Sequence, residues 1–150
     1  MAHYAQGTAV PVERSLAQIR ALLLKAGATH YAFGESPEAG AVQFALKGLH
    51  YRFDVHRPTW DELQKRYQRP GGVSRAAAVD GEWRRRWRAR HLWVKAQIEF
   101  AEVEPEAFTE AMLAHLVLPD GQRLGSWAQP QVEAMYRNGV MPPLLTAGSR

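Results

Sequence analysis

The sequence contains no cysteine among its 150 residues. This absence excludes disulfide frameworks, thiolate zinc sites, iron–sulfur clusters and cysteine nucleophiles, and it is typical of a protein in a reducing cytoplasm. Long apolar runs are missing too, since no stretch approaches the roughly 20 residues that cross a bilayer, and the N-terminus lacks the basic start and apolar stretch of a signal peptide. We therefore expect a cytoplasmic protein with no membrane partner.

Motifs for catalysis are also missing. The stretch PGGVSR lacks the lysine of a phosphate-binding loop, no serine stands in a GxSxG elbow, and the histidines form no HExxH pair. Five carboxylates, Glu35, Glu38, Asp54, Asp61 and Glu62, could hold the metal of a nuclease, but they match no nuclease motif. We expect no catalytic residue, no cofactor and no metal, and we rank a metal-dependent nuclease third among the functions considered.

Basic residues are abundant, and most of them are arginine. The formal net charge is +4, and 15 of the 19 basic residues are arginine, which binds phosphate through paired N–H groups and stacks on flat rings. Asn138 is the one asparagine in the chain, a depletion of heat-labile residues that is typical of thermophiles. The composition favours a nucleic-acid partner and a thermophilic source.

The spacing of apolar residues predicts a single α+β domain. A helical period from Pro11 is closed by Gly27, and the period then changes to two. Three strands follow at residues 29–34, 41–46 and 49–55, with Lys47-Gly48 as a two-residue hairpin turn. The predicted apolar face carries Tyr31, Phe33, Val42, Phe44, Leu46, Leu49, Tyr51, Phe53 and Val55, and the polar face carries Gln43, Lys47, His50, Arg52 and Asp54.

Residues 56–80 lose the apolar rhythm, although TWDELQKRY permits two helical turns capped by Thr59. We interpret this segment as a long, mobile, basic connection, because such connections are usually functional or disordered. A long helix is predicted from Asp80 to about Val103, and two shorter helices follow over 105–117 and 126–139, with a tight turn at Pro119-Asp120-Gly121 between them. The ends, 1–10 and 141–150, are expected to be flexible.

The stretch GEWRRRWRARHLWVK, residues 81–95, opens the long helix with five arginines and three tryptophans. At 100° per residue the helix has two apolar sectors, one with Trp83, Trp87 and Val94, the other with Leu92 and Trp93. Tryptophans in these sectors are expected in a core or an interface, and a second uncovered sector favours self-association. Two polar stripes separate the sectors: Arg84, Arg88, His91 and Lys95 form one, and Arg86, Arg90 and Gln97 form the other.

Arginines near a helix N-terminus face the positive end of the helix dipole and need an acidic partner. If the helix begins near Asp80, Arg84 to Arg88 are in this position. Phosphate groups are one candidate partner, because exposed amides and arginines together bind anions. Intramolecular pairing with acidic residues is the alternative, and the candidates are Glu35, Glu38, Asp61 and Glu62.

From about residue 11 to 145 the chain resembles a group of small uncharacterised proteins of bacteriophages, prophages and integrative elements. The segments that carry the resemblance are ERSLAQIRALLLKAGA, RRRWRARHLWVKAQIE and LPDGQRLGSWAQPQVE. The resemblance implies a setting of mobile DNA and assigns no catalytic residue. The order of a three-stranded meander and a long helix is also similar to the core of single-strand annealing proteins, which is an analogy of topology alone.

These observations favour a non-enzymatic accessory protein of phage-type DNA replication or recombination that binds nucleic acid, preferably single-stranded DNA. The expected nucleic-acid-binding residues are Lys47, Arg52, Arg57, Trp60, Lys65, Arg66, Tyr67, Arg69, Arg75, Arg84, Arg85 and Arg88, with Trp60 and Tyr67 as candidates for base stacking. The alternative is a protein-interaction module, or an oligomeric phage factor that acts on a host protein. We also expect a homo-oligomer.

Overall fold

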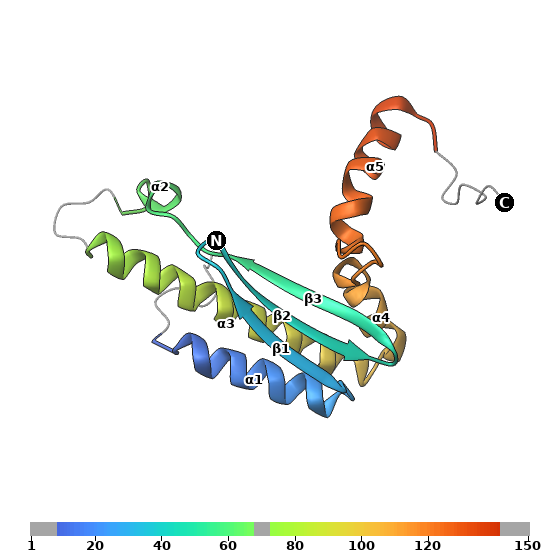
Figure 1. The fold of residues 1–150 in the computed structure, drawn as a ribbon, viewed down its shortest axis with the longest axis horizontal. Helices are drawn as coiled ribbons and strands as arrows, with labels where there is room; N and C mark the ends of the chain where they lie inside the picture. Colours follow the sequence, from blue (N-terminus) through green and yellow to red (C-terminus); the bar gives the residue numbers. More distant parts are fainter. Residues whose placement is uncertain (1–8, 68–72, 142–150) are drawn as a thin grey trace.

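The computed structural model describes residues 9–67 and 73–141 and has the expected α+β architecture (Figure 1). Its elements, in chain order, are α1 (Val12–Lys25), β1 (His30–Glu35), β2 (Ala39–Leu46), β3 (Leu49–His56), α2 (Trp60–Leu63), α3 (Arg75–Ala101), α4 (Pro105–Met112), the 3-10 turn η1 (Leu113–His115) and α5 (Leu124–Asn138). The flexible ends expected at 1–10 and 141–150 lie almost wholly outside the described residues.

The three strands form an antiparallel meander in the order β1-β2-β3, as the period-two pattern predicts. Lys47 and Gly48 have φ angles of 51° and 77°, so both central residues of the β2–β3 turn are left-handed. This backbone is typical of the two-residue turn that matches the twist of a hairpin. It fixes a register in which Val42 pairs with Phe33 on one side and with Phe53 on the other.

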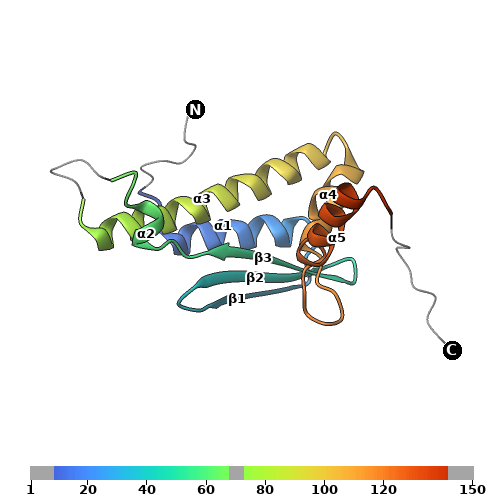
Figure 2. The same cartoon turned by 90° about the horizontal axis from the view of Figure 1, so that it is seen from above.

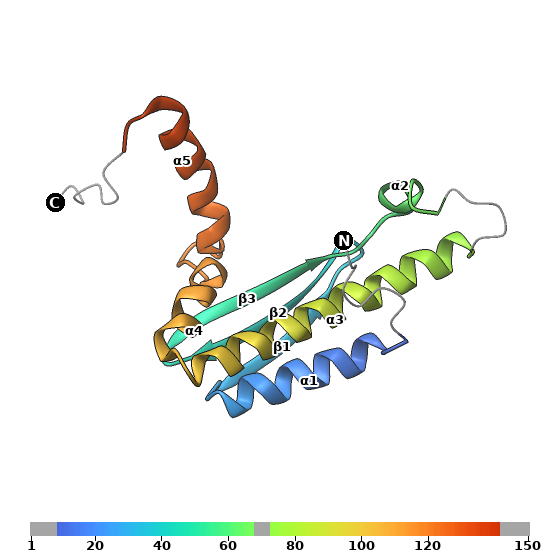
Figure 3. The ribbon, with the colours of Figure 1, turned by 180° about the vertical axis from the view of Figure 1, so that it is seen from behind.

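Helices α1 and α3 lie side by side on one face of the sheet (Figures 2 and 3). The core between the two layers contains Ile19 and Leu23 of α1, Val42 and Phe53 of the sheet, and Trp87 of α3, all with 0% exposure. The predicted apolar face is therefore the buried one, with two corrections. Phe33 and Leu49 are exposed, because Phe33 lies in the edge strand and Leu49 follows the hairpin turn.

Trp83 and Trp87 pack edge to face, with ring centroids 5.6 Å apart, directly against the backbone of Gly40. A Cβ atom at Gly40 would lie 2.7 Å from Trp87 Cζ2, so only glycine leaves room for both indoles at this point of β2. The two tryptophans belong to the core, as the helical pattern predicts. They are not surface platforms for bases.

The start of the long helix differs from the prediction. Helix α3 begins at Arg75, where the Ser74 hydroxyl accepts a hydrogen bond from the Ala77 amide, and not at Asp80. The expected connection 56–80 is thus divided into the short helix α2, a turn, residues 68–72 outside the described part, and the first turns of α3. Hydrophobic periodicity fails here because the first turns of α3 contain three consecutive alanines, which favour helix without an amphipathic pattern.

The C-terminal elements lie at the end of the sheet that carries the β2–β3 turn (Figure 1). Residues 116–124 fold back on themselves around Pro119-Asp120-Gly121, as expected, with the Leu118 amide 2.8 Å from the Gln122 carbonyl. Helix α5 then projects away from the sheet and contains no buried residue. Within the described residues, no helix combines the length and apolarity needed to span a membrane.

Candidate nucleic-acid interface

The arginine-rich part of α3 lies in the middle of the helix. Because α3 begins at Arg75, the residues Arg84 to Arg88 occupy its third and fourth turns and are remote from its N-terminus. The expected conflict with the helix dipole is therefore wrong, since that effect is confined to the first turn. The acidic partners of these arginines must instead be found around the sides of the helix.

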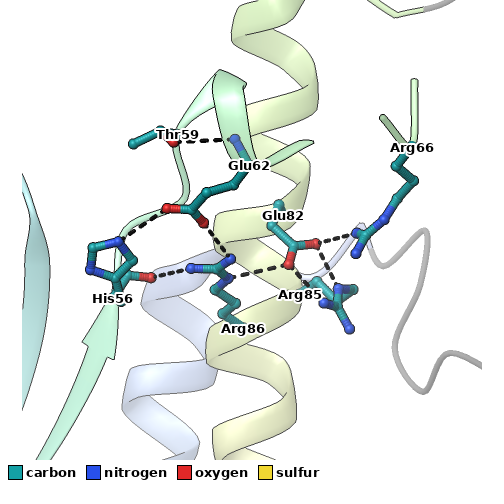
Figure 4. A network of polar contacts seen from close by, with 7 residues as sticks. All are labelled: His56, Thr59, Glu62, Arg66, Glu82, Arg85 and Arg86. Atoms are coloured by element: carbon teal, nitrogen blue, oxygen red, sulfur yellow. Dashed lines mark hydrogen bonds and ion pairs between the residues drawn. The ribbon is translucent and has the colours of Figure 1, made fainter. Parts of the chain in front are cut away.

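On one side of α3, arginines surround a buried carboxylate (Figure 4). Glu82 is 3% exposed, and its two oxygens accept hydrogen bonds from Arg85 at 2.7 Å and 2.7 Å, from Arg86 at 3.2 Å and from Arg66 at 3.1 Å. Burial raises the pKa of Glu82, but the hydrogen bonds and charges of these arginines together lower it to about 2. The carboxylate is ionised at neutral pH and holds three of the arginines.

The network continues through α2 to the end of β3 (Figure 4). Arg86 also donates to Glu62 at 3.1 Å and to the His56 carbonyl at 2.8 Å. The His56 ring lies 3.2 Å from the other oxygen of Glu62, and Thr59 caps α2 by accepting from the Glu62 amide. Of the four acidic residues proposed as intramolecular partners, Glu62 is the one that pairs with an arginine of residues 81–95.

Arg57 and Arg52 are also paired with carboxylates. Arg57 donates to Glu35 at 2.7 Å, and its guanidinium lies 4.9 Å from the ring centre of Trp83. Arg52 lies 2.9 Å from Asp54, which also holds Arg123 at 2.8 Å. These pairs join β3 to β1 and to the C-terminal segment.

A shallow groove of about 430 Å³ runs between β3 and α3. Its lining includes Arg85, Arg86 and Arg90. The Arg90 guanidinium lies 5.1 Å from the ring centre of Phe53 and 5.3 Å from that of Trp93, and burial lowers its pKa. Arg85 and Arg86 in this groove are thus bound to carboxylates, Glu82 and Glu62, whereas Arg90 is partly buried against aromatic rings and forms no ion pair with a described residue.

The opposite side of α3 has a different electrostatic character. We call the surface where α1 and α3 meet the α1–α3 seam, and define its α3 part as Arg84, Arg88, His91 and Lys95. Arg88 donates to Gln18 of α1 at 2.8 Å, and its Nη1 lies 3.0 Å from His91 Nδ1, so both of its partners are uncharged at neutral pH. Arg84 forms no ion pair with a described residue, and its Nε is buried without a hydrogen-bond partner.

The pKa of His91 reflects the positive charges beside it. Burial lowers the pKa of His91, and the positive charges of Arg88 and Lys95 lower it further. Lys95 lies 3.7 Å from Glu99, but both side chains are more than half exposed, and exposed pairs of this kind contribute little. Within the α3 part of the seam, Arg84, Arg88 and Lys95 form a row of cations whose charge is not cancelled by a buried carboxylate.

Helix α1 extends the row with two cations that the sequence did not single out. The Gln18–Arg88 contact places Gln18 on the side of α1 that faces the seam. Arg14 lies one turn before Gln18 and Lys25 two turns after it, so both occupy the same side of α1. Both side chains are exposed and form no ion pair with a described residue. The signal was available in the sequence as the spacing 14, 18, 25.

The residues predicted to bind nucleic acid are thus dispersed. Arg84 and Arg88 lie in the seam, whereas Arg57, Arg66 and Arg85 are held by carboxylates. Trp60, Tyr67 and Arg75 form a cluster at α2, with the two rings 6.5 Å apart and Arg75 over Trp60 at 5.4 Å; Lys65 is exposed in the turn after α2. Lys47 lies in the turn between β2 and β3, at the end of the sheet opposite α2 (Figure 1). Arg69 lies outside the described residues.

The carboxylates considered for a nuclease do not converge. In residues 9–67 and 73–141, no group of three or more histidine, aspartate and glutamate side chains is arranged to hold a metal ion. Glu35, Asp54 and Glu62 are each bonded to an arginine. Their negative charges are therefore paired with arginines of the same chain.

Comparison of the chain with protein-family models, with curated protein sequences and with solved structures gives no match.

Proposed function

We propose that this protein is a non-enzymatic nucleic-acid-binding protein that holds backbone phosphates along the α1–α3 seam. The observation that supports this most directly is the contrast between the two sides of α3. Arg85 and Arg86 on the β3 side are bound to Glu82 and Glu62, and Arg90 lies against the Phe53 and Trp93 rings, whereas Arg84 and Arg88 have no acidic partner among the described residues. A row of such cations attracts a polyanion because binding releases the counterions condensed on it.

The seam fits a strand better than a single phosphate. Arg84, Arg88 and Lys95 lie on successive or alternate turns of one helix, and each turn advances about 5.4 Å. Arg14 and Lys25 provide a second, parallel row on α1. Single-stranded DNA is the preferred ligand, with the aromatic cluster of Trp60 and Tyr67 as a candidate site for stacking bases. A role in phage-type replication or recombination is part of the proposal.

The test is a binding titration with labelled single-stranded and double-stranded oligonucleotides across a salt series. The double variant Arg84→Ala/Arg88→Ala is expected to weaken binding at least about tenfold at low salt and to reduce the salt dependence by one to two phosphate contacts. The matched control, Arg137→Glu, changes the net charge by the same two units at an exposed position outside the seam. Its affinity should fall only by the small amount that the lower net charge of the protein causes.

Two results contradict the proposal. Absence of binding at about 50 mM salt excludes a phosphate-driven function. Equal weakening by the seam variant and the control shows that affinity comes from net charge alone.

A second candidate, a protein-interaction module, is favoured by α5. This helix contains no buried residue, and it exposes Trp127, Val132 and Tyr136 on its surface. Exposed apolar residues that cluster on one element are typical of interaction sites. A variant with Trp127→Ala and Tyr136→Ala tests this candidate. If it keeps full nucleic-acid affinity, the exposed residues of α5 have no part in nucleic-acid binding and are left for binding a protein.

A further inference from the structure

The two edges of the sheet differ in how they are covered. At the outer edge of β3, the Val117 amide donates to the His50 carbonyl at 2.8 Å, and Leu116 bridges to Tyr51. Strand β1 forms the other edge and has no backbone partner on its outer side within the described residues. An exposed edge of this kind is a template for pairing with another strand.

The hydrogen-bond pattern tells which groups of β1 face outward. The Ser36 amide donates to the Ala39 carbonyl at 2.8 Å, which closes the β1–β2 hairpin. In an antiparallel pair every second residue bonds to the neighbour, so His30, Ala32 and Gly34 are directed to β2. The backbone groups of Tyr31, Phe33 and Glu35 therefore point away from the sheet. The strand has no proline, lysine or bulge between these residues that would block pairing.

We propose that β1 pairs in antiparallel fashion with β1 of a second copy of this chain, about a two-fold axis at Phe33. In this register Phe33 lies opposite Phe33 of the partner subunit, and Tyr31 lies opposite Glu35 of the partner subunit. Both are pairs of outward-facing residues, so each exchanges backbone hydrogen bonds across the interface. A two-fold axis through one strand makes the surface complementary to itself.

This register would cover the exposed part of the Phe33 side chain. Its ring packs edge-on against Trp87, with centroids 5.8 Å apart, and is otherwise 39% exposed. Directly opposite residues in such a pair have Cα atoms about 5.5 Å apart, which is close enough for the two Phe33 rings to cover each other. On the other face, Ala32 meets Gly34 of the partner subunit, and neither side chain obstructs the approach.

Charge complementarity identifies the second copy as the occupant. The Arg20 guanidinium lies 5.9 Å from the ring centre of Tyr31 and forms no ion pair with a described carboxylate. Glu35 is bound to Arg57 of its own subunit at 2.7 Å. Because Tyr31 faces Glu35 of the partner subunit, Arg20 becomes a second cation next to that carboxylate in the dimer. The two-fold axis makes this contact twice, and opposite charges across neighbouring strands stabilise pairing.

The dimer would contain a continuous six-stranded sheet with α1 and α3 of both subunits on the same face. This interface is separate from the second apolar sector of α3, through which the sequence pattern predicted self-association. It is also independent of the proposed nucleic-acid function, since neither Arg84 nor Arg88 lies in β1.

The test is the mass of the intact chain in solution by sedimentation equilibrium and light scattering. The wild type is expected at twice the chain mass of 16.9 kDa. Phe33→Lys places two like charges opposite each other at the axis and should raise the dissociation constant at least about tenfold. The control Tyr136→Lys adds the same charge at a side chain that is 88% exposed on α5 and should leave the dimer intact.

A charge reversal keeps the proposal testable if Phe33→Lys impairs folding. Arg20→Glu should weaken the dimer, because it places a second carboxylate next to Glu35 of the partner subunit. Arg14→Glu, the same change on the side of α1 that faces the seam, should leave the dimer intact. A monomeric wild type at about 100 μM, a concentration at which stable dimers persist, overturns the proposal. So does a dimer that is lost in Tyr136→Lys, or one that Arg20→Glu leaves unchanged.

Discussion

Arg85 binds both oxygens of the Glu82 carboxylate, with Nε 2.7 Å from Oε2 and Nη2 2.7 Å from Oε1. The two residues are one helical turn apart, so the pairing needs no distant element. Helix α2 and the turn after it then supply the cover and the third arginine, Arg66. Glu82 is consequently the residue that holds together the ion pairs between α3 and the turn after α2.

Glu82→Gln should lower the free energy of unfolding by about 2–4 kcal/mol, since removal of one member of a buried ionic group leaves its partners uncompensated. Urea denaturation measures this loss. Glu99→Gln is the matched control, because Glu99 pairs with Lys95 on the exposed surface of the same helix. It should change stability by less than about 0.5 kcal/mol. Equal effects of the two changes would contradict the central role of Glu82.

Stability should fall in acid because of the same carboxylate. Its pKa is about 2 in the folded protein, against 4.5 for a free glutamate, so the unfolded chain binds a proton first as the pH falls. The stabilisation is complete above about pH 4.5 and is lost towards pH 2, with a total of about 3 kcal/mol. Denaturation at a series of pH values should show this slope in the wild type, and Glu82→Gln should lack it.

His115 should produce a second decline at higher pH. Burial and, after it, the positive charges of Arg90 and Arg123 together lower its pKa to about 4, against 6.5 for a free histidine. The unfolded chain therefore takes up a proton first, and stability decreases as the pH falls from about 6.5 to about 4, by about 2–3 kcal/mol. His115→Phe keeps a ring against Phe53 and Trp93 and should abolish the dependence within this range. An unchanged profile in that variant would assign the decline to another group.

Gly40→Ala should destabilise the fold by about 1–3 kcal/mol, because the added methyl group overlaps the Trp87 ring in a close-packed core. Gly34→Ala is the control on the neighbouring strand, where a Cβ meets nothing within 4 Å. Thermal unfolding of both variants measures the difference. A Gly40→Ala protein as stable as Gly34→Ala would show that the tryptophans can move aside.

The sheet could be predicted from the sequence because its signals are local. Alternation in 41–46 and 49–55 and the pair Lys47-Gly48 determine the strands, the turn and the buried face together. Phe33 follows the same alternation but is exposed, since an edge strand has a neighbour on one side only. The alternation does not tell which strand lies at the edge.

The candidate site was only partly predictable. Arg84 and Arg88 were recognised, and Glu82 stands three and four residues before Arg85 and Arg86, a spacing that predicts ion pairs on a helix. Which side of α3 stays uncompensated depends on Glu62, which approaches from α2. That approach is a tertiary contact between residues 24 apart, and no local pattern contains it.

The bond between Gln18 and Arg88 joins residues 70 positions apart in the chain. The hairpins of the meander close over short loops, whereas α1 and α3 meet only after this long segment has been enclosed, at an entropic cost that rises with the logarithm of its length. We expect α1–α3 docking to form late on the folding pathway, after the hairpins. Amino-acid changes in the seam should then mainly accelerate unfolding, and changes at the β2–β3 turn should mainly slow folding.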